Sequence, residues 1–261
     1  MEHPLPPSGP HRFPGAAPFL TALSFLTRLT PGHVVSPETL RSSVRWYPAV
    51  GLVLGLLYTM PLWLARTLGC LPPPWPAAWL YVALGFWLTR GLHWDGLADL
   101  GDAWGSNAHG ERFRQILRDS RLGAYGAMAL LLCFSLLLIT AQAHIAAGHF
   151  APLLLAPVIG RSAAVLLAAS TPPHDPDSLG GMACSGATPA TALCATCGGL
   201  IAAVLLLSLP ATLLLTAGLL LLLQRMRALA LAQGGCNGDF LGAAIVLGEL
   251  TVLLTALLPG I

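Results

Sequence analysis

Three aspartates, Asp95, Asp99 and Asp102, stand within eight positions of a chain in which only 9% of the residues are charged. Their spacing of i, i+4 and i+7 confines them to an arc of roughly 60° on a helix that turns about 100° per residue. Ionised carboxylates this close repel each other unless a cation lies between them, and Mg²⁺ and Ca²⁺ prefer such oxygen ligands. The spacing therefore predicts a divalent-cation site. A solvated acidic face, common in soluble proteins, is the alternative.

A second group of polar residues follows about fifteen positions later, at Arg118, Asp119, Ser120 and Arg121. Arginine presents a planar fork of donors that matches phosphate oxygens, and a serine hydroxyl adds a further donor. We interpret Arg118, Ser120 and Arg121 as phosphate-binding residues. Asp119 fits either a structural ion pair with its neighbours or a further metal ligand.

A third group of polar residues lies at the last apolar run. Asn237 and Asp239 stand at the start of this run, and Glu249 lies within it. Asparagine and aspartate at a helix start supply a cap beside free backbone amides, where an anion can bind. Glu249 stands about ten residues into the run, a costly place for an ionisable group unless it has a partner or lines a polar cavity. Arg161, inside another apolar run, is its candidate partner.

The composition predicts the setting of these groups. Hydrophobic residues make up 55% of the chain and the mean hydropathy is +0.72, more than a soluble surface tolerates. Apolar runs near the roughly 20 residues needed to cross a bilayer occur at 44–64, 75–88, 124–147, 152–170, 190–209, 211–223 and 240–258. We expect an all-α polytopic membrane bundle with about six to seven transmembrane helices and one polar site. Residues 1–18 are expected to form a disordered proline-rich tail before a single domain at 19–261, and the proline- and glycine-rich segment 171–189 is expected to contain no helix.

The arginines predict which side of the membrane carries the site. The chain has no lysine, and its arginines concentrate at 28–45, 90–121 and 225–227, which fall on one side if the helices alternate. Arg66 alone lies near a helix end on the other side. By the positive-inside rule the arginine-rich side is cytoplasmic, and the aspartates lie with it. A net charge of only +2 gives no support for a nucleic-acid partner.

These pieces together resemble the cobalamin-5′-phosphate synthase family, also called adenosylcobinamide-GDP ribazoletransferases, which are membrane enzymes of late coenzyme B12 assembly. The likeness runs from about Phe19 to the C-terminus. Two departures stand out, since Val246 occupies a position where the family pattern leads us to expect glutamate, and Arg118 replaces a usual lysine. The matching motifs are 91–99 with Asp102, 119–121 with Gly123 and Gly126, 238–243 with Glu249, and the N-terminal pieces 25–31 and 46–51.

The resemblance implies a transferase of the bacterial inner membrane that joins α-ribazole, or its 5′-phosphate, to adenosylcobinamide-GDP with release of GMP. It implies a requirement for Mg²⁺, a site that faces the cytoplasm, and contact with the lipid bilayer; a homo-oligomer is compatible with it. The expected catalytic residues are Asp95, Asp99, Asp119 and Asp239, with Asp119 or Asp239 as base or as part of the metal shell. The expected metal ligands are Asp95, Asp99, Asp102 and Glu249, and the expected substrate-binding residues are Arg118, Ser120, Arg121, Asn237 and Arg161.

Other classes of membrane protein also use carboxylates. CDP-alcohol-type phosphotransferases gather aspartates around a divalent metal, but their usual pattern includes an Ala-Arg dipeptide after the first aspartates, and here Asp95 and Gly96 are followed by Ala98 and Asp99 instead. A cation-coupled transporter places acids near the bilayer midplane on several helices, whereas only Glu249 among the strongest candidates is expected there. A purely structural membrane subunit would leave the three aspartates unexplained.

Overall fold

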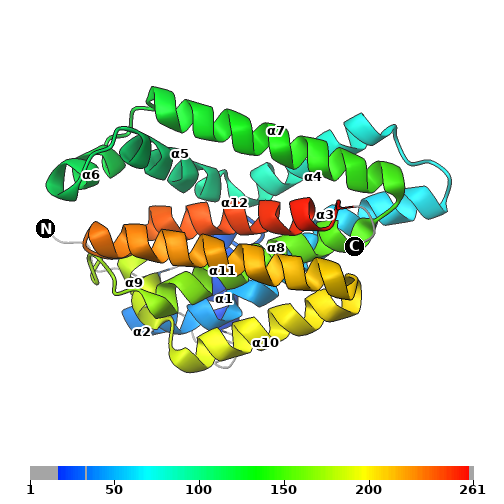
Figure 1. The fold of residues 1–261 in the computed structure, drawn as a ribbon. Coiled ribbons are helices and arrows are strands. Elements are labelled where there is room, and N and C mark those ends of the chain that lie inside the picture. Colours follow the sequence, from blue (N-terminus) through cyan, green and yellow to red (C-terminus); the bar gives the residue numbers. More distant parts are fainter. Residues whose placement is uncertain (1–16, 33, 259–261) are drawn as a thin grey trace, which may run out of the picture.

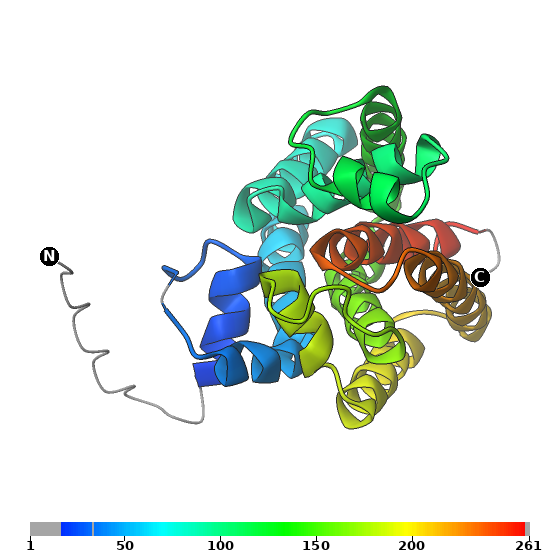
Figure 2. The ribbon, with the colours of Figure 1, turned by 90° about the vertical axis from the view of Figure 1, so that its left-hand side faces the viewer.

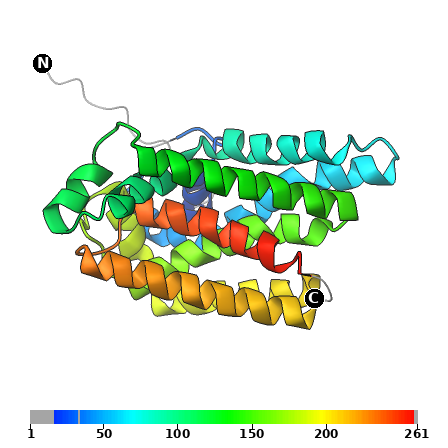
Figure 3. The same cartoon turned by 45° about the horizontal axis from the view of Figure 1, so that its top comes forward.

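The computed structural model describes residues 17–32 and 34–258, and every regular element in these ranges is a helix. The long helices lie side by side in a bundle (Figures 1 and 3). The all-α prediction is therefore confirmed. The elements are α1 (Ala17–Leu26), α2 (Pro37–Ser43), the 3₁₀ turn η1 (Val44–Trp46), α3 (Tyr47–Thr67), α4 (Pro74–Thr89), α5 (Leu92–Gly105), α6 (Gly110–Leu117), α7 (Ala124–Ala147), α8 (Phe150–Ser170), α9 (Leu179–Gly186), α10 (Pro189–Leu206), α11 (Leu209–Ala232) and α12 (Gly238–Thr255).

Six segments of the described chain are long and apolar enough to cross a membrane, namely α2 to α3, α7, α8, α10, α11 and α12. The shorter helices α4 and α5 together run beside α7 (Figures 1 and 3). The chain breaks between them at Arg90 and Gly91, whose φ angles of 59° and 69° are left-handed. Because the helical hydrogen bonding is interrupted there, α5 is a new helix and not a continuation of α4.

The two ends of the bundle differ. The short helices α2, α6 and α9 gather at one end, on the left in Figure 1, while the connections that follow α3, α7 and α10 lie at the other. The helices and connecting segments toward the first end carry the three arginine groups of the sequence, with Arg41 on α2, Arg112 and Arg114 on α6, and Arg225 and Arg227 near the end of α11. Arg66 lies at the opposite end, against Gly148. The observed alternation of helices thus agrees with the expected separation of the arginine groups from Arg66, and we call the first end the polar end.

Two boundaries differ from the sequence prediction. Residues 1–16 of the expected tail lie outside the described residues, but Ala17 and Pro18 already belong to α1. The prediction that segment 171–189 contains no helix is wrong, because α9 occupies Leu179–Gly186. Ser178 caps this helix by accepting a hydrogen bond from the Gly181 amide. Its glycines place the α9 backbone directly against neighbouring segments, so tertiary packing compensates for their low helix propensity.

Helix α8 is the centre of the bundle and packs against α3, α10 and α12. Glycines allow this close packing. A Cβ atom on Gly160 of α8 would lie 2.6 Å from the carbonyl oxygen of Ile245 on α12, and one on Gly248 would lie 3.0 Å from the Gly160 Cα. On the other side, Gly51 of α3 lies directly against the α8 backbone at Pro157. Association of membrane helices depends on this kind of contact between small residues.

We expect Gly160→Ala to lower the free energy of unfolding by about 1–3 kcal/mol, because the added methyl group overpacks the contact between α8 and α12. Gly198→Ala is the matched control, since a Cβ atom there meets nothing within 4 Å on the exposed face of α10. The control should be neutral or slightly stabilising, because alanine is the better helix former. Thermal unfolding of both variants in detergent tests the packing, and equal melting temperatures would contradict it.

Candidate functional site

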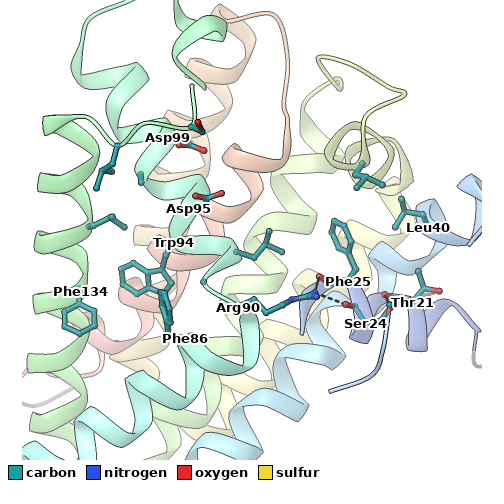
Figure 4. Close-up of a pocket in the computed structure, with 18 of the residues that line it drawn as sticks. Thr21, Ser24, Phe25, Leu40, Phe86, Arg90, Trp94, Asp95, Asp99 and Phe134 are labelled. Atoms are coloured by element: carbon teal, nitrogen blue, oxygen red, sulfur yellow. Dashed lines mark hydrogen bonds between the residues drawn. The ribbon is translucent and has the colours of Figure 1, made fainter. Parts of the chain in front are cut away.

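A cavity of about 1020 Å³ lies near the polar end, between α4, α5 and α7 on one side and α1, α2 and α9 on the other (Figure 4). Figure 2 shows how these two groups of helices are arranged at that end. Asp95 and Asp99 line its wall on α5, and Ser120 lines it from the loop before α7. Most of the remaining lining is apolar, including Trp94 and Phe134. The predicted helix with aspartates on one face is therefore present, and two of its three carboxylates share a cavity.

The third carboxylate beside this pair comes from α12 rather than from α5. A Cβ atom on Gly96 would lie 2.9 Å from the Asp239 Cα, so the start of α12 lies against α5 between Asp95 and Asp99. Asn237 caps α12 by accepting a hydrogen bond from the Phe240 amide, and its Nδ2 donates to Asp239 Oδ2 at 2.8 Å. Asn237 thus fixes the Asp239 carboxylate.

The crowding of negative charge is greatest at Asp99. Burial raises the pKa of the Asp99 carboxyl to about 7, and the nearby carboxylates of Asp239, Asp95 and Asp102 contribute to the rise. Helix α5 is not among the six candidate membrane spans. A carboxylate held near others in this way gains from a bound cation.

Asp102 has a different surrounding from the one the spacing predicts. Its two oxygens accept hydrogen bonds from the backbone amides of Gly123 and Gly126, at 2.7 Å and 2.8 Å. These amides belong to the start of α7, where the first N–H groups have no partner within the helix and attract negative charge. Asp102 thus joins α5 to α7, with both carboxylate oxygens already bonded.

The loop before α7 contains an ion pair. Arg121 and Asp119 bond at 2.6 Å, and this contact lowers the pKa of the Asp119 carboxyl to about 2. The Arg121 side chain is 87% exposed. Arg118 lines a small cleft of about 60 Å³ that also borders Asp239. The sequence allowed Asp119 to be either a structural ion-pair partner or a metal ligand, and the ion pair is what the structure contains.

Arg161 and Glu249 lie elsewhere, inside the bundle. They form the ion pair that the sequence indicated, between the middle of α8 and the middle of α12. Ten residues separate Glu249 from Asp239, which places it about 15 Å further along the helix. Val246 is buried beside this pair. The structure thus separates both Glu249 and Arg161 from the cavity with Asp95 and Asp99.

The sequence analysis missed several residues of the cavity wall. Arg90, at the break before α5, donates hydrogen bonds to the carbonyl oxygens of Ser24 and Phe25 on α1, at 3.0 Å and 3.1 Å. Trp94 packs edge-on against Phe134, with ring centroids 6.2 Å apart. No sequence pattern indicates that Arg90 and Gly91 adopt left-handed backbone angles. The part of the cavity wall formed by α1 could not be predicted either, because it depends on tertiary packing.

The donor chemistry fits Mg²⁺ bound together with a phosphorylated substrate. Among the described residues, no three His, Cys, Asp or Glu side chains are grouped so that they alone could hold a metal ion. Mg²⁺ usually keeps several waters and is bound by one or two carboxylates plus substrate phosphates. Asp95 and Asp99 on one cavity wall match that arrangement, rather than a closed protein cage.

Comparisons with known proteins agree with the family resemblance. The model of the family described as Cobalamin-5-phosphate synthase matches residues 18–257. A relative from Nitratidesulfovibrio vulgaris (strain DP4) is 46% identical over 242 residues, which cover 91% of this chain and 96% of the relative. A relative from Brevibacillus brevis is 38% identical over 244 residues, which cover 90% and 96%. Both are named adenosylcobinamide-GDP ribazoletransferase. No solved structure matches the chain.

We expect Asp102→Ala to lower the free energy of unfolding by about 1–3 kcal/mol, because it leaves two amides at the start of α7 without their acceptor. Asp95→Ala is the control on the same helix. Its exposed carboxylate makes no hydrogen bond to the described residues, so its removal should leave the melting temperature near that of the wild type. A loss in Asp95→Ala as large as in Asp102→Ala would contradict the capping role.

The raised pKa of Asp99 predicts how stability depends on pH. Between the ordinary carboxyl pKa of 3.8 and the folded value of about 7, the native state binds more protons than the unfolded state. Stability should therefore fall as pH rises through this range. Thermal unfolding in chelator from pH 5 to pH 8 should show the decline in the wild type and a flatter profile in Asp99→Asn. Identical profiles would exclude Asp99 as the source.

Proposed function

Because the chain belongs to the cobalamin-5-phosphate synthase family, we propose that the cavity lined by Asp95 and Asp99 is the site where it joins α-ribazole to adenosylcobinamide-GDP. The chain is a transferase that attaches α-ribazole, or its 5′-phosphate, with release of GMP. The comparisons support neither a CDP-alcohol phosphotransferase nor a transporter. The observation that most directly supports this proposal is that two carboxylates share one large, mostly apolar cavity beside the start of α12.

The cavity offers carboxylates for the phosphate chemistry and aromatic side chains for a substrate base. A volume of about 1020 Å³ accommodates parts of two substrates, one of which is a large corrinoid. The aromatic side chains of Trp94 and Phe134 line the same cavity as Asp95 (Figure 4). Aromatic rings pack favourably in stacked or edge-to-face arrangements. We assign this aromatic wall to the base of α-ribazole, which places the sugar toward the carboxylates.

Mg²⁺ is the proposed cofactor, held by Asp95 and Asp99. When bound, it would neutralise charge on the diphosphate of adenosylcobinamide-GDP and on the departing GMP. Asp102 and Glu249 are left out of this proposed ligand set, because the first caps α7 and the second pairs with Arg161. Both ligands therefore come from one face of α5.

The proposed chemistry forms one bond and breaks one. The 3′-hydroxyl oxygen of ribazole bonds to the phosphorus nearest the cobinamide, and the bond from that phosphorus to the bridging oxygen breaks, so GMP leaves. Asp239, held by Asn237 and adjacent to α5, is the proposed base that accepts the hydroxyl proton. Holding the two substrates in one cavity supplies proximity, a large part of such catalysis.

The phosphate contacts are assigned from the positions of the donors. Ser120 lines the cavity, so its hydroxyl is available to a phosphate there. Arg118 borders the cleft at Asp239, where its guanidinium is suited to an oxygen on that side. Arg121 is bonded to Asp119 and must leave it before it contacts a substrate. Arg161 is buried in its ion pair and takes no part in the proposed phosphate binding.

The arrangement of charge supports a location in the bacterial inner membrane with the polar end at the cytoplasm. The arginine groups lie at the same end as the cavity, and the positive-inside rule places such an end on the cytoplasmic side. Both substrates are phosphorylated or polar molecules, so a cavity near an aqueous end of the bundle suits them.

Purified protein in detergent, incubated with adenosylcobinamide-GDP, α-ribazole and Mg²⁺, should release GMP. We expect Asp95→Asn and Asp99→Asn each to lower kcat by about 100-fold or more, since each removes a metal ligand. Chelation should abolish turnover and Mg²⁺ should restore it. Glu111→Gln is the matched control, because Glu111 is an exposed carboxylate at the same end, and among the described residues its side chain bonds to Arg114 alone. This variant should retain near-normal turnover. Near-normal kcat in the aspartate variants would refute the proposed site.

A further inference from the structure

A second polar cavity, of about 30 Å³, lies inside the bundle and adjoins the proposed active-site cavity, with which it shares Phe86 and Trp94. It is lined by residues of α3, α4, α5, α7, α8 and α12, among them Tyr58, His93, Arg161 and Glu249. Arg161 is 1% exposed and His93 is 4% exposed. The proposed reaction uses none of these four side chains, so their burial in one place needs another explanation.

Three polar atoms at this cavity have no hydrogen-bond partner among the described residues. They are the Tyr58 hydroxyl, His93 Nε2 and Arg161 Nε. Arg161 Nη1 donates to Glu249 Oε1. The ion pair therefore uses one nitrogen of the guanidinium and leaves Nε without an acceptor among the described residues. A buried polar group without a partner is destabilising, because it has lost its hydrogen bonds to water. Three such groups around one cavity indicate that a polar molecule satisfies them.

The size of the cavity identifies the molecule. An ordered water needs about 10–15 Å³ of such volume and two to four polar partners. The cavity meets both conditions, and it is too small for a phosphate or a nucleoside. The guanidinium of Arg161 disfavours a cation, while a neutral water accepts from Arg161 Nε and the Tyr58 hydroxyl and donates to His93 Nε2. Its second hydrogen is available to the Glu249 carboxylate.

We propose that a buried water molecule bridges Tyr58, His93 and Arg161, and that His93 is thereby a positioning residue that fixes the rotation of α5 so that Asp95 and Asp99 face the active-site cavity.

The place of His93 in the chain supports this role. Helix α5 starts anew after the left-handed break at Gly91, so the hydrogen bonding of α4 does not continue into it. His93 lies in the first turn of α5, two residues before Asp95. Its backbone also packs against α12, since a Cβ atom on Gly242 would lie 3.2 Å from the His93 carbonyl oxygen. A shift of α5 by one residue would turn its side chains by about 100° and move both aspartates away from the cavity.

The water itself is tested without reference to catalysis. A high-resolution map of the wild-type protein in lipid nanodiscs, without substrates or metal, should show a density peak about 2.7–3.2 Å from Tyr58 Oη, His93 Nε2 and Arg161 Nε. A map that resolves other buried waters and shows none here would overturn the proposal. This result does not depend on the proposed function.

The positioning role rests on the proposed function and is tested by three variants. His93→Leu should lower kcat by about tenfold or more, because small displacements of catalytic groups cost that much or more, with KM for both substrates within about threefold. His93→Gln, which keeps a polar atom at the end of the side chain, should recover most of kcat. His144→Leu is the matched control, because His144 is a buried histidine of α7 that bonds to the Leu253 carbonyl oxygen at 2.9 Å. It should lower the melting temperature and keep kcat.

A fourth variant distinguishes a shared water from separate effects. Tyr58→Phe removes one partner of the water and keeps the ring. Adding Tyr58→Phe to His93→Leu should lower kcat no further than His93→Leu does alone, since both act through the same molecule. Additive losses, or wild-type kcat in His93→Leu, would contradict the positioning role. Absence of GMP release by the wild type would instead refute the proposed function and leave the water test standing.

Discussion

The contact between α5 and α12 is the feature on which the proposed site depends. No side chain separates the two helices where Gly96 meets Asp239 and where Gly242 meets His93. This close approach places a carboxylate from the far end of the sequence beside two from its middle. A larger residue at either glycine would separate the helices, and Asp239 would then move out of reach of Asp95 and Asp99. The glycines that lower helix propensity in α5 therefore have a positional function.

Electrostatics is the reason that a cation is proposed at this contact. Carboxylates from α5 and α12 lie close together at the polar end, and burial raises the pKa of Asp99 further. Proteins retain such an arrangement at functional sites, where a bound cation compensates the repulsion. Asp102 avoids the repulsion differently, by binding the amides at the start of α7. One helix thus uses its acids in two ways, with two facing the cavity and one joining α5 to α7.

The sequence predicted the long helices and the Arg161–Glu249 pair, but it did not show which polar residues share one cavity. Apolar runs predicted the long helices, and isolated charges within such runs indicated that Arg161 pairs with Glu249. Helical spacing could not show that Asp102 turns toward α7, because three aspartates within 60° diverge once different neighbours attract them. Helix α9 was missed for the same kind of reason. Its glycines disfavour a helix in isolation, and only contact with neighbouring backbone makes them suitable.

Glu249 bears most directly on the class of protein. An acid in the middle of a membrane helix is the feature expected of a cation-coupled transporter, in which the carboxylate must be free to bind an ion. Here Arg161 occupies that carboxylate, and the cavity beside them is too small for a hydrated ion. Buried ion pairs are weak evidence for stability, and in some proteins they instead specify how the elements that carry them are arranged. The pair therefore fits a fixed scaffold under the active site better than an ion pathway.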